Sequence, residues 1–206
     1  MTRKVPGSGV LVGVVLGCGL LVAAGHAQDN RASPSAVAVD SSTQQPCFPS
    51  RPGESCPPSL DGLVRLSRCE LERLYRQAQP GAIAEGYARG RAIRWPGTVC
   101  TVPMSKATGL LWHGKIFHNA EGTLVNQWCC GIRAITARVD YGPSWLDGKP
   151  SIIMDYSPTS RVWVDVRDEI REVAPGLFLG IMYRRKCPEP KFVQYFALET
   201  RPCCGP

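Results

Sequence analysis

Short runs in which apolar and polar residues alternate with a period of two fill the chain from Glu85 to its C-terminal region. Turn signals such as Pro96-Gly97, Asp147-Gly148 and Pro175-Gly176 separate these runs. A period of two places alternate side chains on one face of a β-strand, and the spacing of the runs leaves no room for crossover helices. The pattern therefore predicts seven or eight antiparallel strands in a meander.

The predicted strands follow the alternating runs. They cover residues 87–95, 124–128, 132–141, 151–156, 162–173, 177–185 and 192–198, and residues 105–115 fit either a short helix or a loop that leads into a strand. A meander of this many strands curls or closes into a barrel. In the first strand, Ala88, Gly90 and Ala92 share one face, and small residues of this kind are typical of the close-packed inside of a curved sheet.

One short helix is predicted before the strands. Ser67 and Glu70 have the spacing of a capping box, and Leu71, Leu74 and Tyr75 then recur at helical spacing. Pro80-Gly81 stops the run, so the helix is expected at about residues 67–78. The predicted fold class is mainly β: an antiparallel meander that closes into a calycin-like barrel, with one short N-terminal helix.

The N-terminal 27 residues have the pattern of a secretory signal peptide. Arg3 and Lys4 precede the apolar run Val10–Ala24, and Gly25-His26-Ala27 places small residues at a cleavage site. The apolar run is shorter than the roughly 20 residues that a membrane-spanning helix needs. We therefore expect an exported protein, periplasmic or secreted. Lipid anchoring through Cys18, which follows a loose lipobox, and an uncleaved anchor are the alternatives.

Three further segments follow from composition. Residues 28–59 are rich in Pro, Ser, Ala and Gln and contain almost no large apolar side chain, which predicts a disordered linker. Residues 60–201 are expected to form the barrel-like domain, and residues 202–206 a tail. No second apolar stretch of membrane length occurs, so no spanning helix is expected after cleavage.

The chain contains ten cysteines, and nine of them lie beyond the predicted leader. Export makes disulfides the first interpretation, and Cys47 with Cys56 is the easiest local pair. An odd number leaves one thiol free or available for an interchain disulfide. The doublets Cys129-Cys130 and Cys203-Cys204 make a thiolate metal site the second interpretation, although the usual C-x2-C spacing is missing.

Charge and motifs narrow the function classes. The formal net charge of +7 is mildly basic and shows no basic stripe with interleaved aromatic residues, so nucleic acid is not an expected partner. The chain has no P-loop, no dinucleotide-binding fingerprint, no H-E-x-x-H motif and no G-x-S-x-G elbow. We therefore predict no cofactor and no resident metal.

The hairpin formed by residues 162–185 carries many charges on strand-like sequence. With a two-residue turn at Pro175-Gly176, Ala174 pairs with Leu177, Ile170 faces Ile181, and Asp168 faces Tyr183. Asp168 and Glu172 would then point inward, which is costly unless a polar cavity or a partner receives them. The alternative is a β-bulge that shifts the register and turns these acids to solvent, since Pro-Gly suits a two-residue hairpin poorly.

Four segments resemble a widespread uncharacterised family of small proteins. They are WHGKxF at 112–117, YGPSWLDGK at 141–149, Asp155-Tyr156-Ser157, and RDEIREVAPGLFLG at 167–180, and the resemblance spans roughly residues 61–199. It implies a calycin-like or lipocalin-like barrel, a fold that usually holds small apolar ligands. It implies no catalytic residue.

These observations favour an exported barrel that binds a small apolar or amphipathic molecule. The candidate ligand-binding residues are Arg91, Trp112, Lys115, Asp155, Arg167, Asp168, Ile170, Arg171, Glu172 and Tyr183. Two alternatives stay open. One is an enzyme that uses a carboxylate pair such as Asp155 and Asp168 as acid and base. The other is a structural envelope protein joined by interchain disulfides.

Overall fold

A computed structural model describes residues 58–200 of the 206-residue chain. The predicted leader with Cys18, the pair Cys47 and Cys56, nearly all of the linker and the tail lie outside the described residues. Nothing in the structure tests those predictions.

Eight antiparallel strands form a closed barrel, as the alternation predicts. Each strand pairs with its neighbours in sequence, and β1 also pairs with β8 to close the ring. The strands are β1 (Gly86–Ile93), β2 (Trp112–His118), β3 (Thr123–Trp128), β4 (Arg133–Pro143), β5 (Pro150–Asp155), β6 (Val166–Ala174), β7 (Leu177–Arg184) and β8 (Lys191–Glu199). The 3-10 turns η2 (Asn119–Glu121) and η3 (Cys129–Gly131) flank β3.

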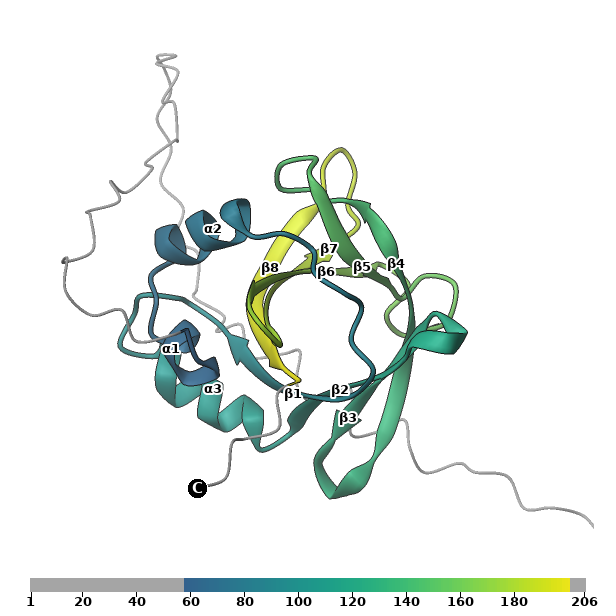
Figure 1. The fold of residues 1–206 in the computed structure, drawn as a ribbon. Coiled ribbons are helices and arrows are strands. Elements are labelled where there is room, and N and C mark those ends of the chain that lie inside the picture. The colour runs from purple at the N-terminus through teal and green to yellow at the C-terminus, as the bar shows by residue number, and fades with distance from the viewer. Residues whose placement is uncertain (1–57, 201–206) are drawn as a thin grey trace, which may run out of the picture. The chain divides into compact units, whose positions relative to one another are not determined.

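Three helices gather on one side of the ring, beside β1, β7 and β8 (Figure 1). They are α1 (Leu60–Val64), α2 (Arg68–Gln77) and α3 (Thr101–Gly109). The predicted helix corresponds to α2, and the capping box between Ser67 and Glu70 is present in both directions. The sequence prediction missed α1, and it left open a short helix or a loop at residues 105–115, where the second half of α3 lies.

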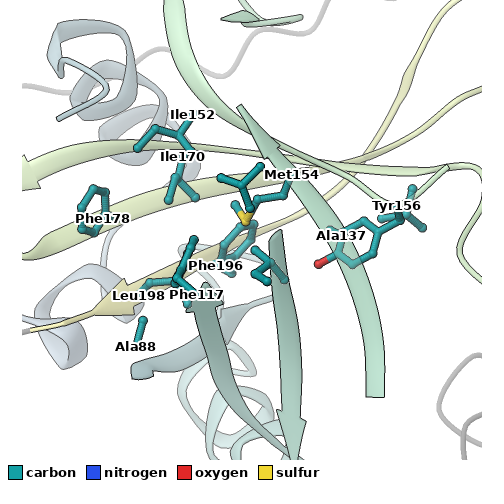
Figure 2. Close-up of a cluster of buried hydrophobic side chains, with 13 residues drawn as sticks. Ala88, Phe117, Ala137, Ile152, Met154, Tyr156, Ile170, Phe178, Phe196 and Leu198 are labelled. Carbon is teal, nitrogen blue, oxygen red and sulfur yellow. The ribbon is translucent and has the colours of Figure 1, made fainter. Parts of the chain in front are cut away.

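The barrel has two apolar cores because β6, β7 and β8 bury residues on both of their faces. The first core fills the lumen, and Figure 2 shows its side chains converging between the strands. It includes Ala88, Phe117, Leu124, Ala137, Ile152, Met154, Ile170, Phe178, Phe196 and Leu198. The second core lies between the outer wall and the helices and includes Leu63, Leu71, Tyr75, Leu179, Ile181, Tyr183 and Tyr195.

Two glycines on the inner face make room for large aromatic rings. A Cβ atom on Gly90 would lie 2.5 Å from the indole of Trp112, and one on Gly180 would lie 2.3 Å from the ring of Phe196. Real Cβ atoms do not approach so closely, so glycine is required at both positions while the rings stay in place. The prediction that small residues of the first strand face a close-packed interior is confirmed.

The register of the β6–β7 hairpin differs from the predicted one. Ala174 pairs with Leu177 as expected, but a bulge between Glu172 and Ala174 then shifts the ladder by one residue. Ile170 therefore pairs with Gly180 and not with Ile181, and Asp168 pairs with Met182 and not with Tyr183. Because a slip of one residue exchanges the faces of a strand, Ile181 and Tyr183 lie on the outer wall.

Residues 78–85, which we call the strap, cross one mouth of the barrel between α2 and β1 (Figure 1). Ile83 and Ala84 pack on the lumen core. The hydroxyl of Tyr141 accepts a hydrogen bond from the Ile83 amide at 3.2 Å and donates one to the Gly81 carbonyl at 3.0 Å. The strap therefore closes this mouth and is attached to β4 by one side chain.

Among residues 58–200, no helix combines the length and the apolar character needed to cross a membrane. The expectation of no spanning helix agrees with this finding.

Candidate functional site: a lysine cluster in the barrel lumen

Four polar side chains meet inside the otherwise apolar lumen. Lys115 comes from β2, Asn126 from β3 and Asp168 from β6, and Tyr156 follows the last residue of β5. We call these four residues the lysine cluster. Each shares the inner face of its strand with apolar neighbours, such as Phe117 beside Lys115, because alternate residues of a strand point to the same side.

Hydrogen bonds connect all four residues around the amine of Lys115. Its Nζ lies 2.9 Å from Asp168 Oδ2, 2.5 Å from the Tyr156 hydroxyl and 3.1 Å from Asn126 Oδ1. The Tyr156 hydroxyl donates to Asp168 Oδ2 at 3.1 Å. Asn126 is oriented by the indole of Trp112, whose Nε1 donates to Oδ1 at 3.0 Å, and by its own bond to the Ile135 carbonyl.

Three aromatic rings surround the same amine. The Nζ atom lies 5.6, 5.3 and 5.4 Å from the ring centres of Trp112, Tyr156 and Phe196. These distances are within the range of cation–π attraction, which partly replaces the water that the ammonium loses on burial. Figure 2 shows Phe196 and Tyr156 in this core, with the Tyr156 hydroxyl directed toward the other side chains.

Burial controls the proton affinities in the cluster. The side chain of Lys115 is 2% exposed and that of Asp168 is 5% exposed. Loss of water lowers the pKa of Lys115, and the neighbouring Asp168 only partly opposes this effect. Burial also raises the pKa of Tyr156, and the negative charge of Asp168 adds to the shift. The tyrosine therefore stays protonated, while the lysine loses its proton more easily than an exposed lysine.

One oxygen of Asp168 has no hydrogen-bond partner among the described residues. Its Oδ2 atom accepts from both Lys115 and Tyr156, whereas its buried Oδ1 atom accepts from none of the side chains or amides around it. An unsatisfied buried polar atom typically costs about 1–3 kcal/mol. The cluster thus presents a free acceptor inside the lumen.

Of the predicted ligand-binding residues, Trp112, Lys115, Asp168 and Ile170 lie in the lumen. Glu172 lies at the mouth beneath the strap, where its Oε1 accepts a hydrogen bond from the Gly176 amide at 2.7 Å. Asp168 therefore points inward, which is one of the two alternatives that the sequence left open, and Glu172 is explained by the turn that it stabilises. The bulge occurs, but it does not turn Asp168 to solvent, because its face depends on its own strand.

Arg171 and Arg167 lie on the outer side of the wall. Arg171 is completely buried and makes a two-pronged ion pair with Asp147, with bonds of 2.7 and 2.9 Å. It also donates to the carbonyl groups of Tyr75, Lys149 and Pro150. These bonds attach α2 and the loop of residues 144–149 to β6, so this arginine stabilises the fold and does not face the lumen.

Glu169 and Arg167, on the same outer face of β6 as Arg171, also hold the loop of residues 144–149 against the barrel wall. Glu169 is buried, and it accepts hydrogen bonds from the Ser144 hydroxyl at 2.5 Å and from the Trp145 amide at 2.8 Å. Burial raises the pKa of Glu169. Arg167 stacks on the Trp145 ring at 4.2 Å and lies 3.3 Å from Glu169.

The remaining predicted residues also lie outside the lumen. Tyr183 packs in the outer core, edge-on to Trp145. Arg91 lies beside Gly109 of α3. Asp155 forms an ion pair with Arg185 at 2.8 Å and pairs across the sheet with Arg167. Because Asp155 and Asp168 point to opposite faces, they do not form the carboxylate pair that the enzyme alternative requires.

Two hollows open on the outside of the barrel wall. One, of about 280 Å³, is lined by residues of β4, β5 and β6 and by Arg185. The other, of about 270 Å³, lies between α2, the end of β1 and β8. The lumen itself is filled by the side chains of the first core.

No group of three or more metal-ligating side chains occurs within residues 58–200. Cys129 and Cys130 carry free thiols, as do Cys100 and Cys187, whereas Cys69 is not free. An interchain disulfide stays a prediction.

The predicted set did not include Asn126 and Tyr156. A signal for both was present in the sequence: Asn126 alternates with Leu124, and Tyr156 continues the alternation of Ile152 and Met154. A polar residue in the phase of an apolar inner face is the pattern that identifies them.

No family model matches the chain, and no curated protein matches it. One similar solved structure is described as "Crystal structure of protein from Thermomonospora curvata". It is 19% identical, with a TM-score of 0.45, and the similarity covers 67% of this chain and 90% of that chain.

Proposed function

We propose that this protein is an exported barrel that binds a small amphipathic molecule in its lumen, with the polar end of the molecule at the lysine cluster. The observation that carries the proposal is the free Oδ1 acceptor of Asp168 within a buried ion pair. A buried pair of charges is often no more stabilising than apolar side chains of equal volume. A barrel selected only for stability has no use for such a pair.

The distribution of side chains along the lumen supports an amphipathic occupant. Toward the strap, the inner wall is apolar and includes Phe117, Ile152 and Phe178. Toward the opposite end, it contains the lysine cluster. A molecule with a hydrogen-bond donor at one end and a short hydrocarbon body would satisfy both regions. Because aromatic rings fill the lumen, binding requires some of them to move.

Export is supported by the basic, apolar and small-residue pattern of the first 27 residues. Lipid anchoring through Cys18 is the alternative. The mass of the mature protein distinguishes an N-terminus released by cleavage after Ala27 from a lipidated Cys18.

Competition binding tests the ligand proposal. Displacement of the fluorescent probe 1-aminoanthracene by 1-decanol would be compared with displacement by the methyl ether of decanol, which lacks the donor. We expect the alcohol to bind at least about tenfold more tightly, since a hydrogen bond to a charged group contributes about 1.5–3 kcal/mol. Asp168→Asn should reduce this preference.

The matched control is Asp155→Asn, which changes a carboxylate on the outer face. This variant should keep the preference for the alcohol. Failure of the wild-type protein to bind either compound, or an unchanged preference in Asp168→Asn, would contradict the proposal.

A further inference from the structure

We infer that the Lys115 amine is a nucleophile that captures an aldehyde or ketone as an imine inside the lumen. This inference deepens the proposed function, on which it rests, by assigning a carbonyl group to the polar end of one class of occupant. The juxtaposition that carries it is a lysine amine within hydrogen-bond distance of a carboxylate, a phenol and an amide, enclosed by aromatic rings.

Imine formation needs an unprotonated amine, and the lumen favours one. The titratable groups that face Nζ within residues 58–200 are Asp168 and Tyr156. Burial lowers the pKa of Lys115 and raises that of Tyr156. The carboxylate of Asp168 can receive the proton that the ammonium gives up, because its Oδ2 lies 2.9 Å from Nζ.

Residues of the lysine cluster can supply and accept every proton that the reaction moves. The amine attacks the carbonyl carbon, a C–N bond forms, and the carbonyl oxygen takes a proton to give a carbinolamine. Tyr156 and the acid form of Asp168 are the donors within reach, and they are linked by a 3.1 Å hydrogen bond. The nitrogen then gives one proton to the Asp168 carboxylate, the acid form of Asp168 passes it to the hydroxyl group, and the C–O bond breaks to release water and leave the protonated imine. Overall, the ammonium and the aldehyde become the iminium and one water, so the positive charge stays paired with Asp168.

The other lysines of the barrel lack this environment. Within residues 58–200 these are Lys106, Lys149, Lys186 and Lys191. All four are exposed, and Lys149 donates to a backbone carbonyl on α2. They react only as ordinary exposed amines and therefore serve as internal comparators in the same molecule.

The segment of residues 157–165 packs beside the lysine cluster, and we expect an aldehyde to enter here. Trp163 in this segment packs edge-on against Tyr156 at 5.3 Å and against Trp128 at 6.1 Å. Its neighbours Val162 and Val164 are exposed. An aldehyde reaches Nζ when this indole moves, so Trp163→Ala should speed up capture.

Reductive trapping tests the inference. The full chain would be treated with hexanal and cyanoborohydride at pH 7, and the position of the added hexyl group would be mapped by peptide mass spectrometry. We expect Lys115 to be modified at least about tenfold faster than Lys106 and Lys149, and Lys115→Arg to lose the fast modification only. Tyr156→Phe should slow capture at Lys115 about 100-fold, the lower end of general acid catalysis, while exposed lysines are unaffected.

The outcomes separate this inference from the proposed function. If exposed lysines react and Lys115 does not, the inference is overturned, whether or not 1-decanol binds. Binding of 1-decanol without a Lys115 adduct leaves the non-covalent proposal intact. A fast Lys115 adduct in a protein that does not discriminate 1-decanol from its ether supports carbonyl capture and contradicts recognition through Asp168 Oδ1.

Discussion

Lys115 and Asp168 form an ion pair that depends on both partners. With side chains 2% and 5% exposed, neither charge has water to replace its partner. Removal of one partner of such a pair typically costs about 3–5 kcal/mol, whereas replacement of both is often nearly neutral. The pair is therefore better explained by recognition or chemistry than by stability.

A double-mutant cycle measures the coupling free energy between Lys115 and Asp168. Lys115→Met should lower the free energy of unfolding by about 3–5 kcal/mol, because it leaves the Asp168 carboxylate unpaired in the lumen. Lys115→Met combined with Asp168→Leu should recover most of that loss. The measurement is urea unfolding followed by tryptophan fluorescence. A double variant that loses the sum of the two single losses would show that the pair does not couple.

At the scale of elements, the hairpin shows what alternation can and cannot predict. The phase of β6 correctly placed Asp168 and Ile170 on one face, because that phase depends on the strand alone. The phase of β7 expected from an unbulged two-residue turn was wrong, because the bulged residue Val173 shifts the pairing. The Pro175-Gly176 turn indicated that a bulge could occur but did not locate it. For this reason Tyr183, which was predicted to bind a ligand in the lumen, lies on the outer wall instead.

Helix α3 was left undecided between a helix and a loop for a different reason. It buries Thr101 and Ser105 and so has no apolar stripe at helical spacing. By contrast, α2 was predicted closely because its capping box and apolar spacing agree. Arg171 was assigned to the lumen because a charge on a strand resembles a binding residue, and only the fold shows the loop that it holds.

The stability that the Arg171–Asp147 ion pair gives to the attachment of the 144–149 loop should decrease at low pH. The hydrogen bonds from Arg171 lower the pKa of Asp147. A carboxyl whose pKa is lower in the folded state stabilises the fold above its ordinary range, and this contribution is lost as the pH falls through the lowered value. Asp147→Asn should therefore destabilise the protein by about 3 kcal/mol at pH 7, and the difference from wild type should shrink as the pH falls below 4.

Urea unfolding across this pH range provides the measurement, and Asp140→Asn is the control, since Asp140 is exposed. Burial raises the pKa of Glu169, so this residue changes the stability with pH in the opposite sense to Asp147. Both proteins contain Glu169, and its contribution therefore cancels in the comparison. A difference that stays constant with pH would contradict the assignment.

For the whole molecule, closure of both mouths determines how anything enters the lumen. The strap closes one mouth, and the segment that contains Trp163 packs on the lumen core at the other end. The class of fold followed from the sequence, but these closures did not, because they depend on contacts between residues distant in the chain.

Tyr141→Phe tests the strap. It removes both hydrogen bonds to residues 81 and 83, which together contribute about 1–3 kcal/mol. Amide hydrogen exchange within residues 78–85 should become roughly 5- to 150-fold faster, while exchange in β6 and β7 is unchanged. Tyr87→Phe, which removes one exposed hydroxyl bond to the His113 carbonyl, is the control. Unchanged exchange in the strap would mean that its other contacts hold it, namely the packing of Ile83 and Ala84 and the backbone bond between Gln79 and Glu172.

Pairing of β1 with β8 has a consequence for behaviour at high concentration. Among residues 58–200 the ring of strands is closed, so it offers no open row of amide and carbonyl groups. Exposed strand edges are the usual templates for aggregation and for addition of a strand from another chain. The folded barrel therefore resists both.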